Sequence, residues 1–362
     1  MQPTAAELAA LGIHDPSAPD ARQQLQLLEY LISLGATTED LVAYRDELPG
    51  LAAVVAVRGG ALTLSEMVDR TGVSEEKLLR IIRAAGFPQP GPDDRVLSEQ
   101  FAGLAAGMAA AEAIFGQDAV LQLVRVMGAA MARLADAIVS AFLVNVEPAA
   151  RDEDPVGLGV ARANAEASAL MPTVNAALDV LLRQHIVAAR RTILEDAADA
   201  GYETQRLFVG FVDLVGSTAL AQRLSTRELG SVLTEFEHVA ADTVTSAGGR
   251  VVKLIGDEVL YTASDEASGC SIALSLAATF KDHPVVPPVR VGVAAGDVLL
   301  RDGDVFGPVV NLAARAVKAA PSGEVVAPTT VATIAGMRAE SVGPHHLKGV
   351  DDDVKLSRLL PP

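Results

Sequence analysis

The chain has 362 residues, half of them hydrophobic, and a formal net charge of −17 at pH 7. This length predicts two domains with ordinary cores, and the hydrophobic content excludes a disordered chain. The negative charge argues against non-specific binding to nucleic acid or to an anionic membrane, and a single cysteine, Cys270, excludes an internal disulfide framework and a cysteine-based zinc site.

The N-terminal sequence lacks the basic start and apolar core of a secretory signal. The most apolar region, residues 100–146, is interrupted by charged side chains. No uncharged apolar run approaches the roughly 18–20 residues that a membrane-spanning helix needs. We therefore expect a soluble, cytoplasmic protein with no transmembrane segment.

Residues 1–200 predict an all-helical domain. Apolar residues recur three and four positions apart between residues 120 and 142, and a second periodic stretch runs over residues 173–198. Strand signals are almost absent from this half. The second stretch predicts a helix that connects the two domains.

Residues 62–88 have the pattern of a helix-turn-helix, in which Ser74 caps the second helix. In a DNA-binding unit, the start of that helix would face bases and phosphates. Glu75 and Glu76 stand there, and their charges repel DNA. The pattern therefore favours a helical packing unit, and binding of nucleic acid is not expected.

The pattern changes at Leu207, after a junction at residues 195–205. Short β-rich runs such as "LFVGFVDLV" and "RVVKLIGDEVLYTA" alternate with helical segments. Residues 201–362 are therefore expected to form a second domain that combines strands and helices.

Two aspartates in this domain stand where strands end. Asp213 follows "LFVGFV", and Asp257 lies in the Gly-Asp turn of "VVKLIGDEVLY", which reads as a hairpin. If the two strands are neighbours, both carboxylates meet at one edge of the sheet. Such oxygen ligands suit Mg²⁺ or Mn²⁺ carrying the phosphates of a nucleotide.

Other polar residues stand in settings that call for a partner or a ligand. Lys253 lies inside an apolar strand, where a charge is costly unless it is paired. Pro308 predicts a helix start, and Asn311 and Arg315 then share one face of that helix, where they can hold a ribose and a phosphate. Lys348, in "HHLKGV", is a candidate phosphate contact.

The stretches "FVDLVGST", "VVKLIGDEVL", "RVGVAAGDV", "DVFGPVVNLAARA" and "HLKGV" occur in an order and spacing that resemble the class III nucleotidyl cyclase catalytic domain. The resemblance covers residues 207 to about 360. It implies an α+β domain with a ferredoxin-like βαββαβ core. It also implies a head-to-tail homodimer, with the active sites at the interface.

Carried over by position, the resemblance gives each polar residue a role. Metal binding falls to Asp213 and Asp257, purine selection to Lys253 and Asp304, transition-state contacts to Asn311 and Arg315, and a phosphate contact to Lys348. It implies two Mg²⁺ or Mn²⁺ ions per site. A lysine donates to N1 of adenine and a carboxylate accepts from N6, so ATP is the expected substrate and 3′,5′-cyclic AMP and pyrophosphate the expected products.

Two alternatives stay open at this point. One is a guanylyl cyclase, and the other is a catalytically silent nucleotide sensor that drives the helix-turn-helix. The sequence also departs from many relatives in two places, at Ser217, where an aromatic residue is common, and in the short segment "GDVLLRDGDVFG".

The N-terminal half resembles the all-helical, inhibitory regulatory domain of some actinobacterial adenylyl cyclases, including pH-responsive mycobacterial ones. That resemblance implies autoinhibition and a response to acidity, with His185, His345 and His346 as titratable candidates. Its Ala-, Leu- and Met-rich helices are also candidates for enclosing an apolar ligand such as a lipid.

Overall fold

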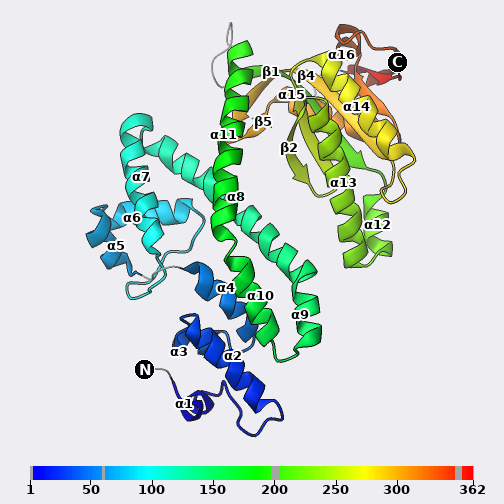
Figure 1. Cartoon of the computed structure of the whole chain (residues 1–362). Helices are drawn as coiled ribbons and strands as arrows, with labels where there is room; N and C mark the ends of the chain where they lie inside the picture. The colour runs from blue at the N-terminus through cyan, green and yellow to red at the C-terminus, as the bar shows by residue number, and fades with distance from the viewer. Residues whose placement is uncertain (1–2, 59–61, 197–203, 347–352, 362) are drawn as a thin grey trace. The chain divides into compact units, whose positions relative to one another are not determined.

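The computed structural model describes residues 3–58, 62–196, 204–346 and 353–361, without the side chains of residues 191–196 (Figure 1). The chain divides into two compact units, Met1–Arg183 and Gln184–Pro362. The predicted domain boundary between residues 200 and 201 lies outside the described residues, so it stays a prediction.

The described part of the N-terminal unit is helical, as the sequence predicted, with one isolated β-bridge between Leu62 and Leu97. The predicted helices over residues 120–142 and 173–198 correspond to α8 and α11, and the last helix continues into the second unit. The helices are α1 (Ala5–Ala10), α2 (Ala21–Ser33), α3 (Thr38–Ala43), α4 (Leu48–Arg58), α5 (Leu64–Thr71), α6 (Glu75–Ala84), α7 (Glu99–Phe115), α8 (Gln117–Asn145), α9 (Glu147–Glu153), α10 (Leu158–Ser168) and α11 (Met171–Asp196).

Local sequence signals explain where several of these helices begin. Thr4, Thr37 and Thr63 each accept a hydrogen bond from the backbone three residues on, and the acid at that position bonds back to the threonine N–H. These capping boxes satisfy backbone donors that a helix start leaves unpaired. Residues 62–88 form the expected helix-turn-helix, in which Gly72 ends α5 with a φ of +67°.

The N-terminal unit has separate small cores. One joins α2, α4 and α10 through residues such as Leu28, Leu31 and Ala161. Another joins α5, α6 and α7 through residues such as Met67 and Leu78. Burial of these apolar side chains stabilises each packing unit.

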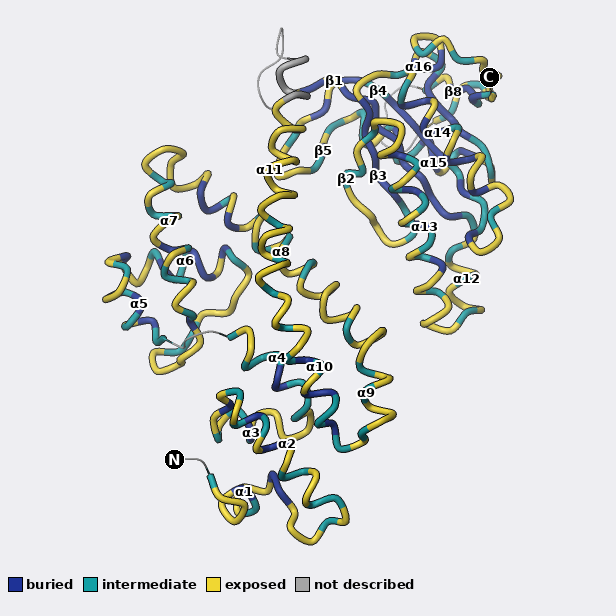
Figure 2. Tube along the Cα trace, viewed as in Figure 1, coloured by how far each residue is buried: buried dark blue, intermediate teal, exposed yellow. Residues whose placement is uncertain are grey.

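Much of α8 lies outside these cores. Figure 2 shows most of this helix as exposed, and its exposed apolar side chains include Met127, Met131, Val139 and Leu143. By length and composition, Gln117–Glu153 could cross a membrane, with a mean hydropathy of 1.6 in a window that is 0% buried. The expected absence of a transmembrane segment is therefore not confirmed, although one such helix is weak support for a span.

The C-terminal unit is built on one mixed sheet, in the order β2-β3-β1-β4-β6-β8-β7, with β5 paired to β4. β4 and β6 are parallel, whereas the other pairs are antiparallel. The strands are β1 (Thr204–Leu214), β2 (Arg250–Ile255), β3 (Glu258–Ala263), β4 (Val289–Arg301), β5 (Asp304–Phe306), β6 (Val325–Pro328), β7 (Ala339–His345) and β8 (Val354–Leu359). The helices are α12 (Ser217–Arg223), α13 (Thr226–Ser246), α14 (Glu266–Lys281), α15 (Pro308–Ala319) and α16 (Thr329–Ile334). This arrangement confirms the expected α+β class.

Side chains of β1 alternate between two cores. Phe208 and Val212 pack with α13 and α14 on one face, whereas Val209 and Phe211 pack with α15 on the other. Because successive side chains of a strand point to opposite faces, this alternation puts Asp213 on the α15 face.

Glycine sets how closely α15 approaches the sheet. A Cβ built at Gly292, in β4, would lie 1.9 Å from the backbone nitrogen of Val317 in α15. Only a residue without a side chain allows this contact. The glycine therefore fixes the position of the helix that carries Asn311 and Arg315.

Candidate active site

Asp213 and Asp257 lie at the same end of the sheet, as predicted. β1 and β3 are antiparallel neighbours, and the N–H of Leu214 donates to the carbonyl of Asp257 at 3.1 Å. The turn between β2 and β3 starts with Gly256, whose φ of +63° favours glycine. The predicted hairpin is thus present, and its turn carries Asp257.

Asp213 is buried, at 4% exposure, and has a charged partner that the sequence reasoning did not identify. Arg290, opposite it on β4, donates from Nε to Oδ2 of Asp213 at 2.7 Å. Nη2 of Arg290 contacts the same oxygen. The signal available in the sequence was an arginine in the otherwise apolar run "VRVGVAA".

A third carboxylate stands beside the two aspartates. Glu258 is the register partner of Asp213 on β3. Burial raises the pKa of Glu258, and the negative charges of Asp213 and Asp257 raise it further, while Lys318 and Arg290 lower it. This end of the sheet is therefore an electrostatic environment that favours a bound cation.

The donor set fits a hard divalent ion in part. Carboxylate oxygens are the ligands that Mg²⁺ and Mn²⁺ prefer, and these ions keep several waters or substrate phosphates as further ligands. Within the described parts of the chain, no group of three or more His, Cys, Asp or Glu side chains forms a metal site by itself. The two aspartates would thus supply part of a ligand shell.

Lys253 has the partner that its position in an apolar strand required. Its Nζ lies 2.5 Å from Oδ2 of Asp304 on β5. The other oxygen of Asp304 accepts from the N–H of Val305 at 2.8 Å. Nearby, Arg250 donates to the carbonyl of Gly303 at 3.3 Å. These contacts hold the β4–β5 hairpin against β2.

Asn311 and Arg315 lie on α15, which begins at Pro308 as predicted. Asn311 is exposed and Arg315 is half-buried. Their four-residue spacing puts them on one face of the helix. Lys348 lies outside the described residues, so its contact remains a prediction.

The three histidines named as titratable candidates occupy separate places. His185 is exposed on α11. Nδ1 of His345 lies 3.2 Å from the carbonyl oxygen of Gly343, and Nδ1 of His346 lies 3.4 Å from Asp353. The two C-terminal histidines therefore have local partners, and none of these contacts involves a predicted active-site residue.

Comparison with known proteins identifies both halves. Residues 9–188 match the adenylate cyclase regulatory domain, and residues 201–357 match the adenylate and guanylate cyclase catalytic domain. An uncharacterized protein of Mycobacterium tuberculosis is 35% identical over 97% of this chain and 93% of its own length. An adenylate cyclase of Streptomyces coelicolor is 35% identical over 72% of this chain and 68% of its own length.

A pH-sensitive adenylate cyclase of M. tuberculosis is 28% identical over 93% of this chain and 88% of its own length. Among solved structures, the adenylyl cyclase CyaB of P. aeruginosa matches 44% of this chain and 97% of its own, with 22% identity and a TM-score of 0.41. The family matches and the identity to named cyclases agree with the motifs in the second half. The chain therefore belongs to the adenylate cyclase family, as an enzyme with a regulatory domain followed by a class III cyclase catalytic domain.

Proposed function

We propose that the chain converts ATP into 3′,5′-cyclic AMP and pyrophosphate at sites shared by two copies of the chain. The observation that carries this proposal is the pair formed by Lys253 and Asp304, whose charged atoms lie 2.5 Å apart. This pair presents a donor beside an acceptor, the pattern that reads N1 and N6 of adenine. The named relatives that align along much of the chain are adenylate cyclases.

The same pair disfavours the guanylyl cyclase alternative. Guanine presents a donor at N1 and an acceptor at O6, so each group would face a like partner. Leaving polar groups mispaired in a binding site is strongly unfavourable. Competition between ATP and GTP for the purified protein tests this selectivity.

Asp213 and Asp257 are the residues that would hold two Mg²⁺ or Mn²⁺ ions with the triphosphate. Ions bound there would lower the pKa of the ribose 3′-hydroxyl and would neutralise charge on the phosphates. The position of both aspartates at one end of the sheet, and the raised pKa of Glu258 beside them, support this assignment.

The remaining roles belong to side chains that orient and stabilise the substrate. Asn311 orients the ribose, so that its 3′-oxygen faces the α-phosphate. The guanidinium of Arg315 stabilises the negative charge that grows on the α-phosphate during attack. Lys348 contacts the departing pyrophosphate.

We place these groups in a homodimer, with the metal-binding aspartates of one chain and the other groups of its partner at each site. Exposed apolar side chains on the strands around the site support an interface there. Leu254 and Ile255 lie on β2 and Phe306 on β5, and all three are more than 40% exposed. Large apolar groups of this kind mark contact surfaces when they gather.

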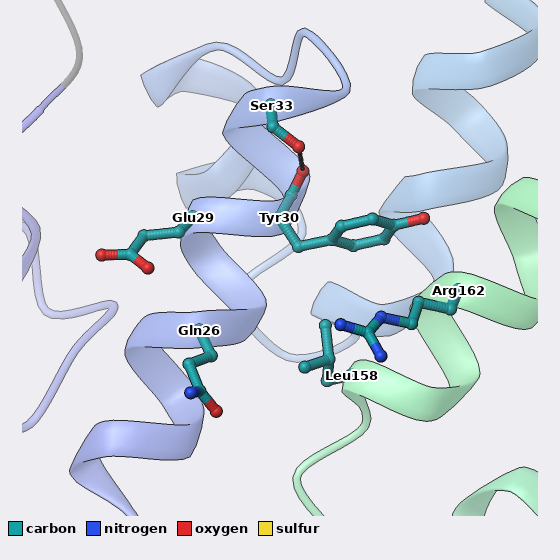
Figure 3. A pocket seen from close by; sticks show the side chains of 6 residues that line it. All are labelled: Gln26, Glu29, Tyr30, Ser33, Leu158 and Arg162. Carbon is teal, nitrogen blue, oxygen red and sulfur yellow. Dashed lines mark hydrogen bonds between the residues drawn. The ribbon is translucent and has the colours of Figure 1, made fainter.

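For the N-terminal unit we propose a regulatory, inhibitory role in the cytoplasm. The exposed apolar side chains of α8 and of α11, such as Leu181 and Leu182, are available to a second copy or to an apolar ligand. A groove of about 530 Å³ between α2 and α10 has a largely polar lining that includes Gln26, Glu29 and Arg162 (Figure 3), so it is a poor match for a lipid chain.

The proposal is tested by incubating purified protein with ATP and Mn²⁺ and measuring cyclic AMP, with Asp257→Ala as the matched control. Asp257 lies in a turn, so its replacement removes a carboxylate and leaves the sheet core untouched. We expect product from the native chain only. Tight ATP binding without turnover, together with binding to DNA, would support the silent sensor instead. Equal product from both proteins would point to contamination.

A further inference from the structure

Arg290 approaches Asp213 in an unusual way, with its donors on one oxygen. Nε donates to Oδ2 of Asp213 at 2.7 Å, and Nη2 contacts that same atom. The hydrogen bond and the shortest ion-pair contact between these two side chains thus both fall on Oδ2.

A second, partly buried pair in the chain shows the common alternative. Arg58 donates to both oxygens of Asp40, with distances of 2.6 Å to Oδ1 and 3.0 Å to Oδ2. In that bidentate geometry two guanidinium nitrogens each bond a different carboxylate oxygen. At Asp213 the hydrogen bond and the shortest ion-pair contact are instead both made by Oδ2.

The local charges show why Asp213 needs Arg290. The Asp213 side chain is only 6% exposed, and Asp257 and Glu258 bring two more carboxylates to the same end of the sheet. Removing the partner of a buried charge is strongly destabilising. β1 and β4 already pair from Thr204 to Leu214, so the ion pair is not needed to join these strands.

We propose that Arg290 is a positioning residue for the metal site. It compensates the charge of Asp213 in the metal-free chain and holds the carboxylate through Oδ2, so that Oδ1 is free for Mg²⁺ or Mn²⁺. This inference rests on the proposed function, because it takes Asp213 as a metal ligand. In this proposal Arg290 acts through Asp213, its partner in the structure.

The test is thermal unfolding of the full chain, once in EDTA and once with Mn²⁺ and 3′-deoxy-ATP, which lacks the attacking hydroxyl. For Arg290→Gln we expect the metal-free melting temperature to fall by about 5 °C or more. The deficit should shrink with Mn²⁺, which supplies positive charge at the same place. With ATP and saturating Mn²⁺, kcat should fall more than about tenfold, because Asp213 is no longer held. Arg290→Lys keeps the positive charge but lacks the planar guanidinium group, so its melting temperature and its kcat should lie between those of wild type and Arg290→Gln.

Arg358→Gln is the matched control, because the ion pairs of Arg358, on β8, are with Glu324 and Glu340 and not with the aspartates. The melting temperature of Arg358→Gln should lie below that of the wild-type chain by the same amount in EDTA and with Mn²⁺ and 3′-deoxy-ATP. If Arg290→Gln behaves like this control, Arg290 is structural and the inference is wrong. If Arg290→Gln does not fold, the double variant Asp213→Asn/Arg290→Gln should recover folding, since no buried charge is left alone, and failure to recover would contradict the inference.

The wild-type chain separates this outcome from failure of the proposed function. Its melting temperature should rise with Mn²⁺ and 3′-deoxy-ATP, and the rise should be smaller in Asp213→Asn. A rise that Asp213→Asn leaves unchanged would overturn the metal role of Asp213 and the inference with it. A different result is that the melting temperature of the wild-type chain rises with Mn²⁺ in a way that depends on Asp213, while Arg290→Gln melts below wild type by the same amount with and without Mn²⁺. That result would overturn the role of Arg290 and leave the metal role of Asp213 intact.

Discussion

Lys253 and Asp304 are 51 positions apart in the sequence, yet Nζ of the lysine lies 2.5 Å from Oδ2 of the aspartate. The contact joins β2 to the short hairpin of β4 and β5. Because the two side chains remain partly exposed, at 41% and 25%, a ligand can reach them. The pair is thus preformed in a single chain, and a bound base would meet groups that are already in place.

This relationship predicts how substrate choice can be changed. Lys253→Glu combined with Asp304→Cys removes the donor and acceptor proposed to read adenine and introduces a carboxylate that can accept from N1 of guanine. We expect the ratio of kcat/KM for ATP to that for GTP to fall by about 100-fold or more. Steady-state kinetics with each nucleotide check this. Arg250→Gln, which removes only the neighbouring bond to Gly303, should leave the ratio unchanged; a similar shift in that control would mean that the hairpin position, not the base-reading pair, sets selectivity.

The close approach of α15 to β4 predicts a stability effect with a direct consequence for activity. Gly292→Ala puts a methyl group against the backbone of Val317, and we expect a loss of about 3 kcal/mol in the free energy of unfolding. Cyclase activity should fall as well, because α15 carries Asn311 and Arg315. Urea unfolding and cyclic AMP production measure the two effects.

Gly230 provides the control for that substitution, because it lies exposed in α13 and a methyl group added to it would have no atom within 4 Å. Gly230→Ala should be neutral or should stabilise the helix by roughly 0.5–1 kcal/mol. If Gly292→Ala lowers the free energy of unfolding no more than Gly230→Ala does, α15 packs less tightly against β4 than the structure has it.

The pair of Asp40 and Arg58 predicts a pH effect in the regulatory unit. Burial alone raises the pKa of Asp40, but hydrogen bonds from Arg58 and Thr37 outweigh burial and hold that pKa below its ordinary 3.8. A carboxyl whose folded pKa is depressed stabilises the fold above the unfolded pKa, and this stabilisation is lost as pH falls through the folded pKa.

Asp40→Asn should therefore lower the free energy of unfolding by about 1–2 kcal/mol at pH 7. The difference from wild type should shrink below the ordinary pKa of 3.8. Urea unfolding followed by circular dichroism at pH 7, 4 and 3 measures it. Glu39→Gln, at the exposed neighbour on α3, is the control and should show little difference at any pH. A difference for Asp40→Asn that is constant with pH would exclude an electrostatic origin.

The response to acidity that the resemblance implies is tested by the triple variant His185→Ala, His345→Ala and His346→Ala. If these imidazoles carry the response, the dependence of cyclase activity on pH should flatten in the variant between about pH 5 and 8. Activity against pH in wild type and variant is the measurement. Superimposable profiles would remove all three residues as sensors.

Sequence patterns were most informative where chemistry is local. The Gly-Asp turn predicted the hairpin, Pro308 predicted the start of α15, and Ser74 predicted the start of α6, because each depends on a few adjacent residues. Lys253 signalled its need for a partner because a charge in an apolar strand is unfavourable. The site assignments by position remain predictions, and Lys348 lies outside the described residues.

Relationships between distant strands were beyond sequence reasoning. The pairing of Asp213 with Arg290 depends on the register of β1 against β4, which the spacing of residues along the chain does not fix. The contact between Gly292 and Val317 likewise follows from how a helix packs on the sheet. The apolar length of α8 was underestimated, because charged residues interrupt the run but leave its average hydropathy high.

The central claim is that each site combines the metal-binding aspartates of one chain with the transition-state residues of another, and complementation tests it most directly. Asp257→Ala and Asn311→Ala should each be inactive alone. Co-expressed in one cell, they should form mixed dimers with one intact site, and random pairing should restore about a quarter of wild-type specific activity. A mixture that stays inactive although mixed dimers are isolated, or a monomer with full activity, would contradict the account.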